Sequence, residues 1–213
     1  MTSLGPPGVE MDDISSTEPR LDPPTIGFLA RLNPAQGLDK LVDAFLTLRK
    51  DSRFKKLRLS ATGGYTPADN GFLEGIRKKL DNAGAAAAAE FLKEFQMVQR
   101  GEFLNSLSVL SVPAPEGEAF GIHLLEAMAH GVPVVQPAVG AYPEIVEATG
   151  GGILYDPKDP KGLILALESL LGNPEELKRL GTQGRRSVLE KYNMDRAVRE
   201  MLAVYETVLD RKP

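Results

Sequence analysis

Residues 115–135, with the sequence PEGEAFGIHLLEAMAHGVPVV, concentrate more chemistry than any other stretch of the chain. A Gly-containing loop precedes a short segment with apolar residues at helical spacing. Gly131-Val132-Pro133 then leads into an apolar run typical of a strand. Glu118 and Glu126 lie on either side of the junction between loop and helix. The pattern predicts a tight loop and a helix between two strands, with both carboxylates near the start of the helix.

The chain has 213 residues, 42% hydrophobic and 25% charged, which is enough for one domain with a sizeable core. The formal net charge of −4 gives no electrostatic reason to expect binding to nucleic acid or to an anionic membrane surface. Cysteine is absent, so we expect no disulfides, and the composition suits a cytoplasmic protein. No apolar run approaches the roughly 18 residues of a membrane span, so no transmembrane segment is expected.

Short apolar runs alternate with segments of helical periodicity along most of the chain. Strands are predicted at residues 25–30, 56–61, 88–92, 108–112, 133–136 and 153–155. Helices are predicted at residues 38–48, 72–80, 99–107, 159–171, 175–192 and 195–210, and a loop with a short helix at residues 140–148. The alternation predicts an α/β fold: a Rossmann-like parallel sheet with helices on both faces. Phe45 and Tyr205, on two of these helices, are expected in the core.

Two segments are less regular. Residues 85–89 are all alanine, which favours helix by propensity, but the alternation requires a strand at residues 88–92. Residues 1–24 are rich in Gly, Pro and acidic side chains, and we interpret them as a linker or partly disordered interdomain segment. Residues 25–213 are interpreted as one domain. A chain that opens on such a linker is expected to be the downstream piece of a longer protein.

The residues at the ends of the predicted strands favour a particular kind of ligand. Open α/β sheets bind ligands outside the carboxyl ends of their strands, where residues 118–122 are predicted to lie. The N-terminus of the helix that follows favours an anion such as a phosphate. Glu126 can accept hydrogen bonds from a vicinal diol such as a ribose, and Arg31 can offer a bidentate cation. A ligand that carries an anion, a diol and a polyol in one crevice is expected to be a nucleotide sugar.

The same stretch resembles the donor-site signature of retaining group-1 glycosyltransferases with the GT-B fold. In that family a Glu, a small residue and Phe-Gly precede a helix that carries a second Glu after seven intervening residues. Glu118-Ala119-Phe120-Gly121 and Glu126 match this spacing. The match continues through residues 127–128, 131–135, 140, 143–146 and, upstream, residues 28–37. The resemblance covers nearly the whole chain and implies one half of a GT-B fold, the C-terminal half that binds the donor.

The resemblance also implies a role for each matching residue. Glu126 would hold the ribose hydroxyls, and Glu118 would contact the transferred sugar. Arg31 would stabilise the diphosphate as its bond to the sugar breaks, so Arg31 and Glu118 are the expected catalytic residues. The backbone N–H groups expected to meet the sugar and the diphosphate belong to Phe120, Gly121 and Ile122. The expected donor is a UDP, GDP or ADP sugar, with no metal and no other cofactor.

Two residues depart from the family pattern. Ala30 stands where the family commonly has Gly, and Gln36 stands where it usually has Lys. The second departure removes one of two phosphate-facing cations. We therefore expect Lys40, one helical turn beyond Gln36, to substitute for it in part, with both residues lining the donor site. The expected partner is an N-terminal GT-B domain, in the same protein or on another chain.

Other interpretations of these features are open to test. His123, Glu126 and His130 share one helix face and could form half of a metal site, but two histidines supply no second half. His130 is instead interpreted as a helix-end residue favoured by the dipole. Gly63-Gly64 follows a predicted strand, yet no G-x-G-x-x-G motif accompanies it, which argues against a dinucleotide cofactor. The alternative function is a non-catalytic or degenerate nucleotide-binding or regulatory module of GT-B origin.

Overall fold

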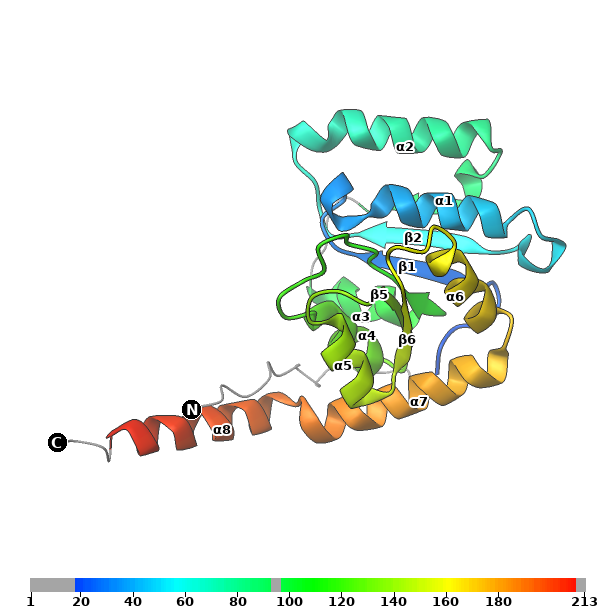
Figure 1. The fold of residues 1–213 in the computed structure, drawn as a ribbon. Coiled ribbons are helices and arrows are strands. Elements are labelled where there is room, and N and C mark those ends of the chain that lie inside the picture. Colours follow the sequence, from blue (N-terminus) through cyan, green and yellow to red (C-terminus); the bar gives the residue numbers. More distant parts are fainter. Residues whose placement is uncertain (1–17, 93–96, 210–213) are drawn as a thin grey trace.

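The structure is a computed structural model that describes residues 18–92 and 97–209. Within these ranges six strands form one parallel sheet in the order β3-β2-β1-β4-β5-β6 (Figure 1). The strands are β1 (Thr25–Leu29), β2 (Arg58–Thr62), β3 (Ala89–Phe91), β4 (Val109–Leu110), β5 (Val134–Pro137) and β6 (Gly152–Tyr155). The predicted α/β fold with a parallel sheet is confirmed, and its strand order is that of dinucleotide-binding Rossmann folds.

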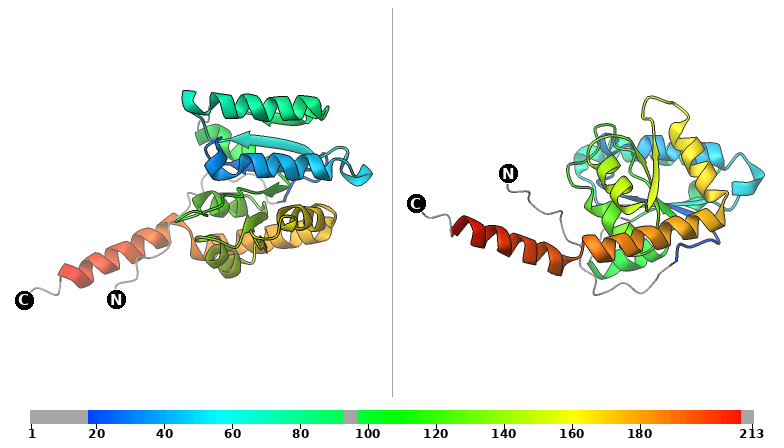
Figure 2. Two further views of the ribbon diagram at one scale, coloured as in Figure 1. Left: turned by 45° about the horizontal axis from the view of Figure 1, so that its top comes forward. Right: turned by 60° about the horizontal axis from the view of Figure 1, so that its bottom comes forward.

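Helices cover both faces of the sheet (Figures 1 and 2). They are α1 (Leu38–Leu48), α2 (Asn70–Asn82), α3 (Met97–Asn105), α4 (Ile122–Ala129), α5 (Tyr142–Thr149), α6 (Gly162–Leu171), α7 (Pro174–Lys191) and α8 (Met194–Leu209). Short 3-10 turns are η1 (Pro34–Gln36), η2 (Ser52–Phe54), η3 (Pro67–Asp69) and η4 (Ala86–Ala88). Helices α1, α2 and α6 lie on one face and α3, α4 and α5 on the other, while α7 packs against α4, α5 and α6.

Each face of the sheet has its own hydrophobic core, because successive side chains of a strand point to opposite faces. In β1, Ile26 and Phe28 pack into the core shared with α1, α2 and α6. Leu29 packs into the other core, with Leu110 and Val134 of the neighbouring strands. Fully burying one such side chain contributes roughly 1.5–3 kcal/mol, so both layers are firmly attached to the central strands.

The strand predicted at residues 88–92 is confirmed at β3, despite the alanine run. Leu59 and Ala61 of β2 pair in parallel with Ala89 and Phe91 of β3. This pairing at the sheet edge prevails over the helical preference of alanine. The alanines just before the strand form the turn η4 instead of a longer helix.

The strand order reverses between β1 and β4, and this is where the loops that follow the two strands meet. Strand β1 pairs with β2 on one side and with β4 on the other. Gly37, just after the loop that follows β1, has a φ of 76°. A Cβ at Gly37 would overlap the backbone carbonyl of Pro113 in the loop after β4. The two loops therefore lie backbone against backbone at the carboxyl edge of the sheet.

Part of the predicted linker contacts the domain. The Arg20 N–H donates to the carbonyl of Leu107 at 2.8 Å, and the Ser108 hydroxyl donates to the carbonyl of Arg20. Residues 1–17 lie outside the described ranges. The predicted boundary at residue 24 stays a prediction.

Helix α8 extends past the sheet, away from the body of the domain (Figure 2). Tyr205, which we expected in the core, is 57% exposed, so that prediction is wrong. Amphipathic spacing predicts an apolar face, but it does not predict which element covers that face. Among the described residues, none of the helices combines the length and apolar character needed to cross a bilayer.

The contact at Gly37 gives a stability prediction. Gly37→Ala should lower the free energy of unfolding by about 2–4 kcal/mol. The new side chain would be strained by the left-handed φ and would also overlap the Pro113 carbonyl, and the two energetic costs add. Gly75→Ala is the matched control, since Gly75 lies in the exposed middle of α2 with open space around it. The free energy of unfolding of Gly75→Ala should rise by roughly 0.5–1 kcal/mol, because alanine favours the helix more than glycine does. Urea unfolding measures the stability of both variants. A Gly37→Ala variant as stable as the parent would contradict the close approach of Gly37 to Pro113.

Candidate functional site

An open cavity of about 870 Å³ lies at the carboxyl edge of the sheet, where the strand order reverses. Open α/β sheets bind their ligands at this position. The cavity is lined by Leu29, Ala30, Arg31, Gln36, Gly63, Gly64, Arg100, Glu118, Ala119, Phe120, Gly121, Ile122, His123 and Glu126. The structure thus brings together seven of the eight predicted site residues, from loops after β1 and β4 and from α4. The eighth, Lys40, lies elsewhere.

The N-terminus of α4 forms one wall of the cavity. Gly121 is the N-cap of α4, and its φ of 57° turns the chain from the loop into the helix. Leu124 and Leu125 are buried in the core beneath, which fixes the direction of the helix. The first N–H groups of a helix have no partners within it and carry partial positive charge. Because residues 121–123 line the cavity, this positive end faces it.

Arg31 is anchored by a carboxylate that the sequence analysis did not identify. Asp69 Oδ2 accepts hydrogen bonds from Arg31 Nη2 at 3.0 Å and from Arg31 Nε at 3.3 Å. The same oxygen accepts from the backbone N–H of Thr66 at 2.7 Å and from its hydroxyl at 2.8 Å. The bonds from Thr66, and then those from Arg31, hold the pKa of Asp69 below its usual value. Half of the Arg31 side chain stays exposed, so its guanidinium is held at one edge and still lines the cavity.

A sequence signal for Asp69 was present. Thr66-Pro67-Ala68-Asp69 is a capping box with Pro in the first turn, a pattern that marks the start of a helix. The helix was predicted only from residue 72, so its first turn was missed.

Glu126 is paired with Arg100, which was also not predicted. Arg100 Nη2 lies 2.5 Å from Glu126 Oε2. Burial raises the pKa of Glu126, and the charge and hydrogen bond of Arg100 act against this rise. The helix that carries Arg100 was predicted, but periodicity does not reveal that its first turn would face α4.

His123 lies in the cavity wall beside Glu118. Its Nδ1 is 3.7 Å from Glu118 Oε2, and its ring packs edge-on against Tyr142. Burial, assisted by the charge of Arg100, lowers the pKa of His123 to about 4, so the imidazole is neutral near pH 7. Burial also raises the pKa of Glu118. Among the described residues, the buried His123 Nε2 finds no hydrogen-bond partner, which leaves one polar atom of the cavity wall unsatisfied.

His130 does not belong to this cavity. It is the C-cap of α4, and its Nδ1 lies 2.7 Å from Asn105 Oδ1. Burial, and then the charge of Arg185, lower its pKa, so its place at a helix end does not favour the charged form here. Within residues 18–92 and 97–209, no group of three or more His, Cys, Asp or Glu side chains is arranged to hold a metal ion.

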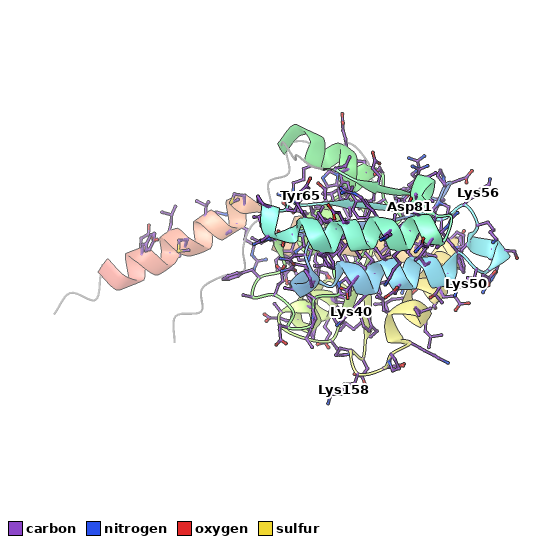
Figure 3. The ribbon with its side chains drawn as sticks, turned by 90° about the horizontal axis from the view of Figure 1, so that it is seen from above. Lys40, Lys50, Lys56, Tyr65, Asp81 and Lys158 are labelled. Carbon is purple, nitrogen blue, oxygen red and sulfur yellow. The ribbon has the colours of Figure 1, made fainter. Side chains whose placement is uncertain are left out.

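Gln36 and Lys40 are separated by the fold. Gln36 ends η1 and lines the cavity, where its buried Oε1 finds no partner among the described residues. Lys40, labelled on α1 in Figure 3, lines a different cavity of about 320 Å³ with Asp43. The prediction assumed one continuous helix from Gln36 to Lys40. Gly37 interrupts it with a left-handed backbone, so the two side chains do not share a face.

Comparison with known proteins assigns the family. Residues 10–187 match the family described as Glycosyl transferases group 1, and the chain therefore belongs to that family. The MMP alpha-(1->4)-mannosyltransferase of Mycolicibacterium hassiacum is 29% identical over 207 residues, which are 97% of this chain and 48% of the relative. The chain thus spans about half the length of the curated relatives it matches.

Solved structures show the same half-fold. The C-terminal domain of a group 1 family glycosyl transferase (LpcC) from Francisella tularensis superposes with a TM-score of 0.73 at 22% identity, covering 91% of this chain and 98% of that one. The Anabaena protein Alr3699/HepE, solved in complex with UDP and glucose, has a TM-score of 0.74 at 18% identity, covering 87% of this chain and 48% of that one. The sheet and its helices therefore form one half of a GT-B fold, as the sequence predicted.

The neutral state of His123 predicts how stability depends on pH. In the unfolded chain its pKa is near 6.5, so between pH 6.5 and about 4 the unfolded state binds a proton that the folded state does not. The free energy of unfolding should fall as the pH is lowered through this window, by roughly 2–3 kcal/mol from this group.

Urea unfolding of the parent and of His123→Gln at several pH values measures this contribution. The variant should show a weaker loss of stability between pH 6.5 and 4. His130→Gln is the control, because the pKa of His130 is lowered less than that of His123, so His130 should contribute less to the pH dependence. An unchanged pH dependence in His123→Gln would contradict the buried neutral imidazole.

Proposed function

We propose that this chain is the donor-binding domain of a retaining glycosyltransferase. It binds a nucleoside diphosphate sugar, and it transfers the glycosyl group when joined to an N-terminal GT-B domain that supplies the acceptor site. One observation carries the proposal: the N-terminus of α4, Arg31 and Glu126 converge on a single cavity at the carboxyl edge of the sheet. The UDP and glucose found in the Anabaena protein with the same half-fold support it.

The diphosphate is assigned to the N-terminus of α4 and to Arg31. Backbone N–H groups of Phe120, Gly121 and Ile122 and the helix dipole favour negative charge. Arg31 adds a cation whose orientation Asp69 fixes before the ligand arrives. As the bond between sugar and diphosphate breaks, charge develops on the leaving phosphate oxygen. Donors that are already oriented stabilise this charge with little reorganisation, which is the catalytic role proposed for Arg31.

The carboxylates are assigned to hydroxyl groups. Glu126, at the first turns of α4, accepts hydrogen bonds from the ribose, and Glu118, in the loop before it, accepts from the transferred sugar. Both are partly buried, so a hydroxyl that reaches them replaces water at a site of lower dielectric. No residue of the cavity is required to act as a metal ligand in this scheme.

Gln36 supports a second candidate function. A neutral amide lines the cavity where the family usually has Lys, and this suits a nucleotide-binding or regulatory module without transferase activity. Both candidates bind a nucleoside diphosphate. They differ when the chain is joined to an N-terminal GT-B domain, because only the transferase then releases nucleoside diphosphate from its donor.

Calorimetric titration of the chain with UDP, GDP and ADP tests nucleotide binding. At least one should bind, and Glu126→Gln should weaken that binding by about 10-fold or more, because a neutral amide accepts more weakly from the ribose hydroxyls than a carboxylate does. No binding of any of the three at millimolar concentration, or equal affinity in Glu126→Gln, would contradict the proposed site.

The anchoring of Arg31 gives a separate prediction. Asp69→Asn keeps the shape of the side chain but weakens its hold on the guanidinium, so affinity for the bound diphosphate should fall by about 3–10-fold. Affinity for the matching monophosphate should fall less. Lys40→Ala is the control and should leave binding unchanged, since Lys40 lies in another cavity. Tighter binding by Asp69→Asn would show that Asp69 masks the charge of Arg31 and does not position it.

A further inference from the structure

We propose that Arg100 is a positioning residue for Glu126: it holds one carboxylate oxygen and presents the other to the ribose hydroxyls of the nucleotide. This inference rests on the proposed function and extends it to a residue outside the family signature. Arg100 lies in the first turns of α3, and Glu126 lies on α4. Both side chains line the same cavity, so their ion pair is part of the cavity wall.

The geometry leaves Glu126 able to do both tasks. Arg100 Nη2 donates to Oε2 of Glu126 at 2.5 Å. A carboxylate has two oxygens and about four acceptor positions, so an oxygen held by a guanidinium leaves the other to accept from a hydroxyl. The pair also fixes the rotamer of a side chain that would otherwise lose more conformational freedom when the ligand binds.

The ionised state of Glu126 also depends on Arg100. Only 17% of the Glu126 side chain is exposed, and its burial disfavours the charged form. The charged or titratable side chains that line the cavity with it are Arg100 from α3, His123 from α4, Glu118 from the loop after β4, and Arg31 after β1. His123 is neutral near pH 7, and Glu118 has the same sign as Glu126. Of these side chains, Arg100 is the cation in direct contact with Glu126.

Calorimetry with the 213-residue chain can isolate this role. The probes are UDP, GDP and ADP, each compared with its 2′,3′-dideoxy counterpart, which lacks the ribose hydroxyls. The parent should prefer the ribonucleotide by about 10-fold or more. In Arg100→Gln this preference should fall to about 2-fold, while affinity for the dideoxy nucleotide changes little.

The pH dependence gives a second readout. Glu126 must be ionised to accept strongly from the hydroxyls, so ribose preference is lost as the pH falls through the pKa of Glu126. Without Arg100 that pKa rises further, and Arg100→Gln should lose its remaining preference at a higher pH than the parent. Arg100→Lys keeps a positive charge without the planar fork, so it should keep the pH profile of the parent with a reduced preference.

Arg179→Gln is the matched control. Arg179 forms an ion pair with Glu176 on α7 and does not line the cavity, so ribose preference should be unchanged. If Arg100→Gln does not fold, as judged by circular dichroism, Arg100→Lys decides: a reduced preference supports the inference and an unchanged preference overturns it.

Three results would overturn the inference. Arg100→Gln could keep the ribose preference of the parent, which leaves the proposed function intact. It could lose affinity equally for ribose and dideoxy nucleotides, which would mean that Arg100 acts on the fold or on the charge of the cavity and not through Glu126. The parent could bind none of the three nucleotides, in which case the proposed function fails as well.

Discussion

The parallel pairing of β1 with β4 is the constraint on which the site depends. Ile26 and Gly27 pair with Val109 and Leu110, so the ends of two strands that are distant in the sequence lie next to each other. From β1 the chain moves to one side of the sheet and from β4 to the other, which opens a crevice between their loops. The hydrophobic cores on both faces stabilise this arrangement, and the close contact of Gly37 with Pro113 sets how near the two loops approach.

Two guanidinium–carboxylate pairs then determine the electrostatics of the crevice. Arg31 is held by Asp69, and Glu126 is held by Arg100. In the proposed site, the first pair offers its cation to the ligand and the second offers its carboxylate. Under this proposal each partner orients the side chain that meets the ligand, so less conformational freedom is lost on binding. The neutral His123 lies beside Glu118 in the cavity wall and adds no charge to it near pH 7.

The sequence predicted the layers of the fold because alternating apolar runs and helical periodicity reflect burial directly. Glu118 and Glu126, which line the cavity, were singled out because their spacing around a helix start resembles the family signature, and such a signature is a local pattern. Arg100 was missed because its ion pair with Glu126 joins α3 to α4, two helices that are distant in the sequence. Lys40 was misplaced because a single left-handed residue broke the assumed helix. Tyr205 was misplaced because its exposure depends on which element covers α8.

The proposed function requires that the N-terminus of α4 binds a nucleoside diphosphate at the point where the strand order reverses. Backbone amide spectra of the ¹⁵N-labelled chain, recorded during titration with UDP, GDP and ADP, test this binding residue by residue. The largest shifts should occur at residues 120–122, with further changes at Arg31 and at Gly63-Gly64. Shifts confined to the cavity around Lys40, or none at millimolar nucleotide, would contradict it.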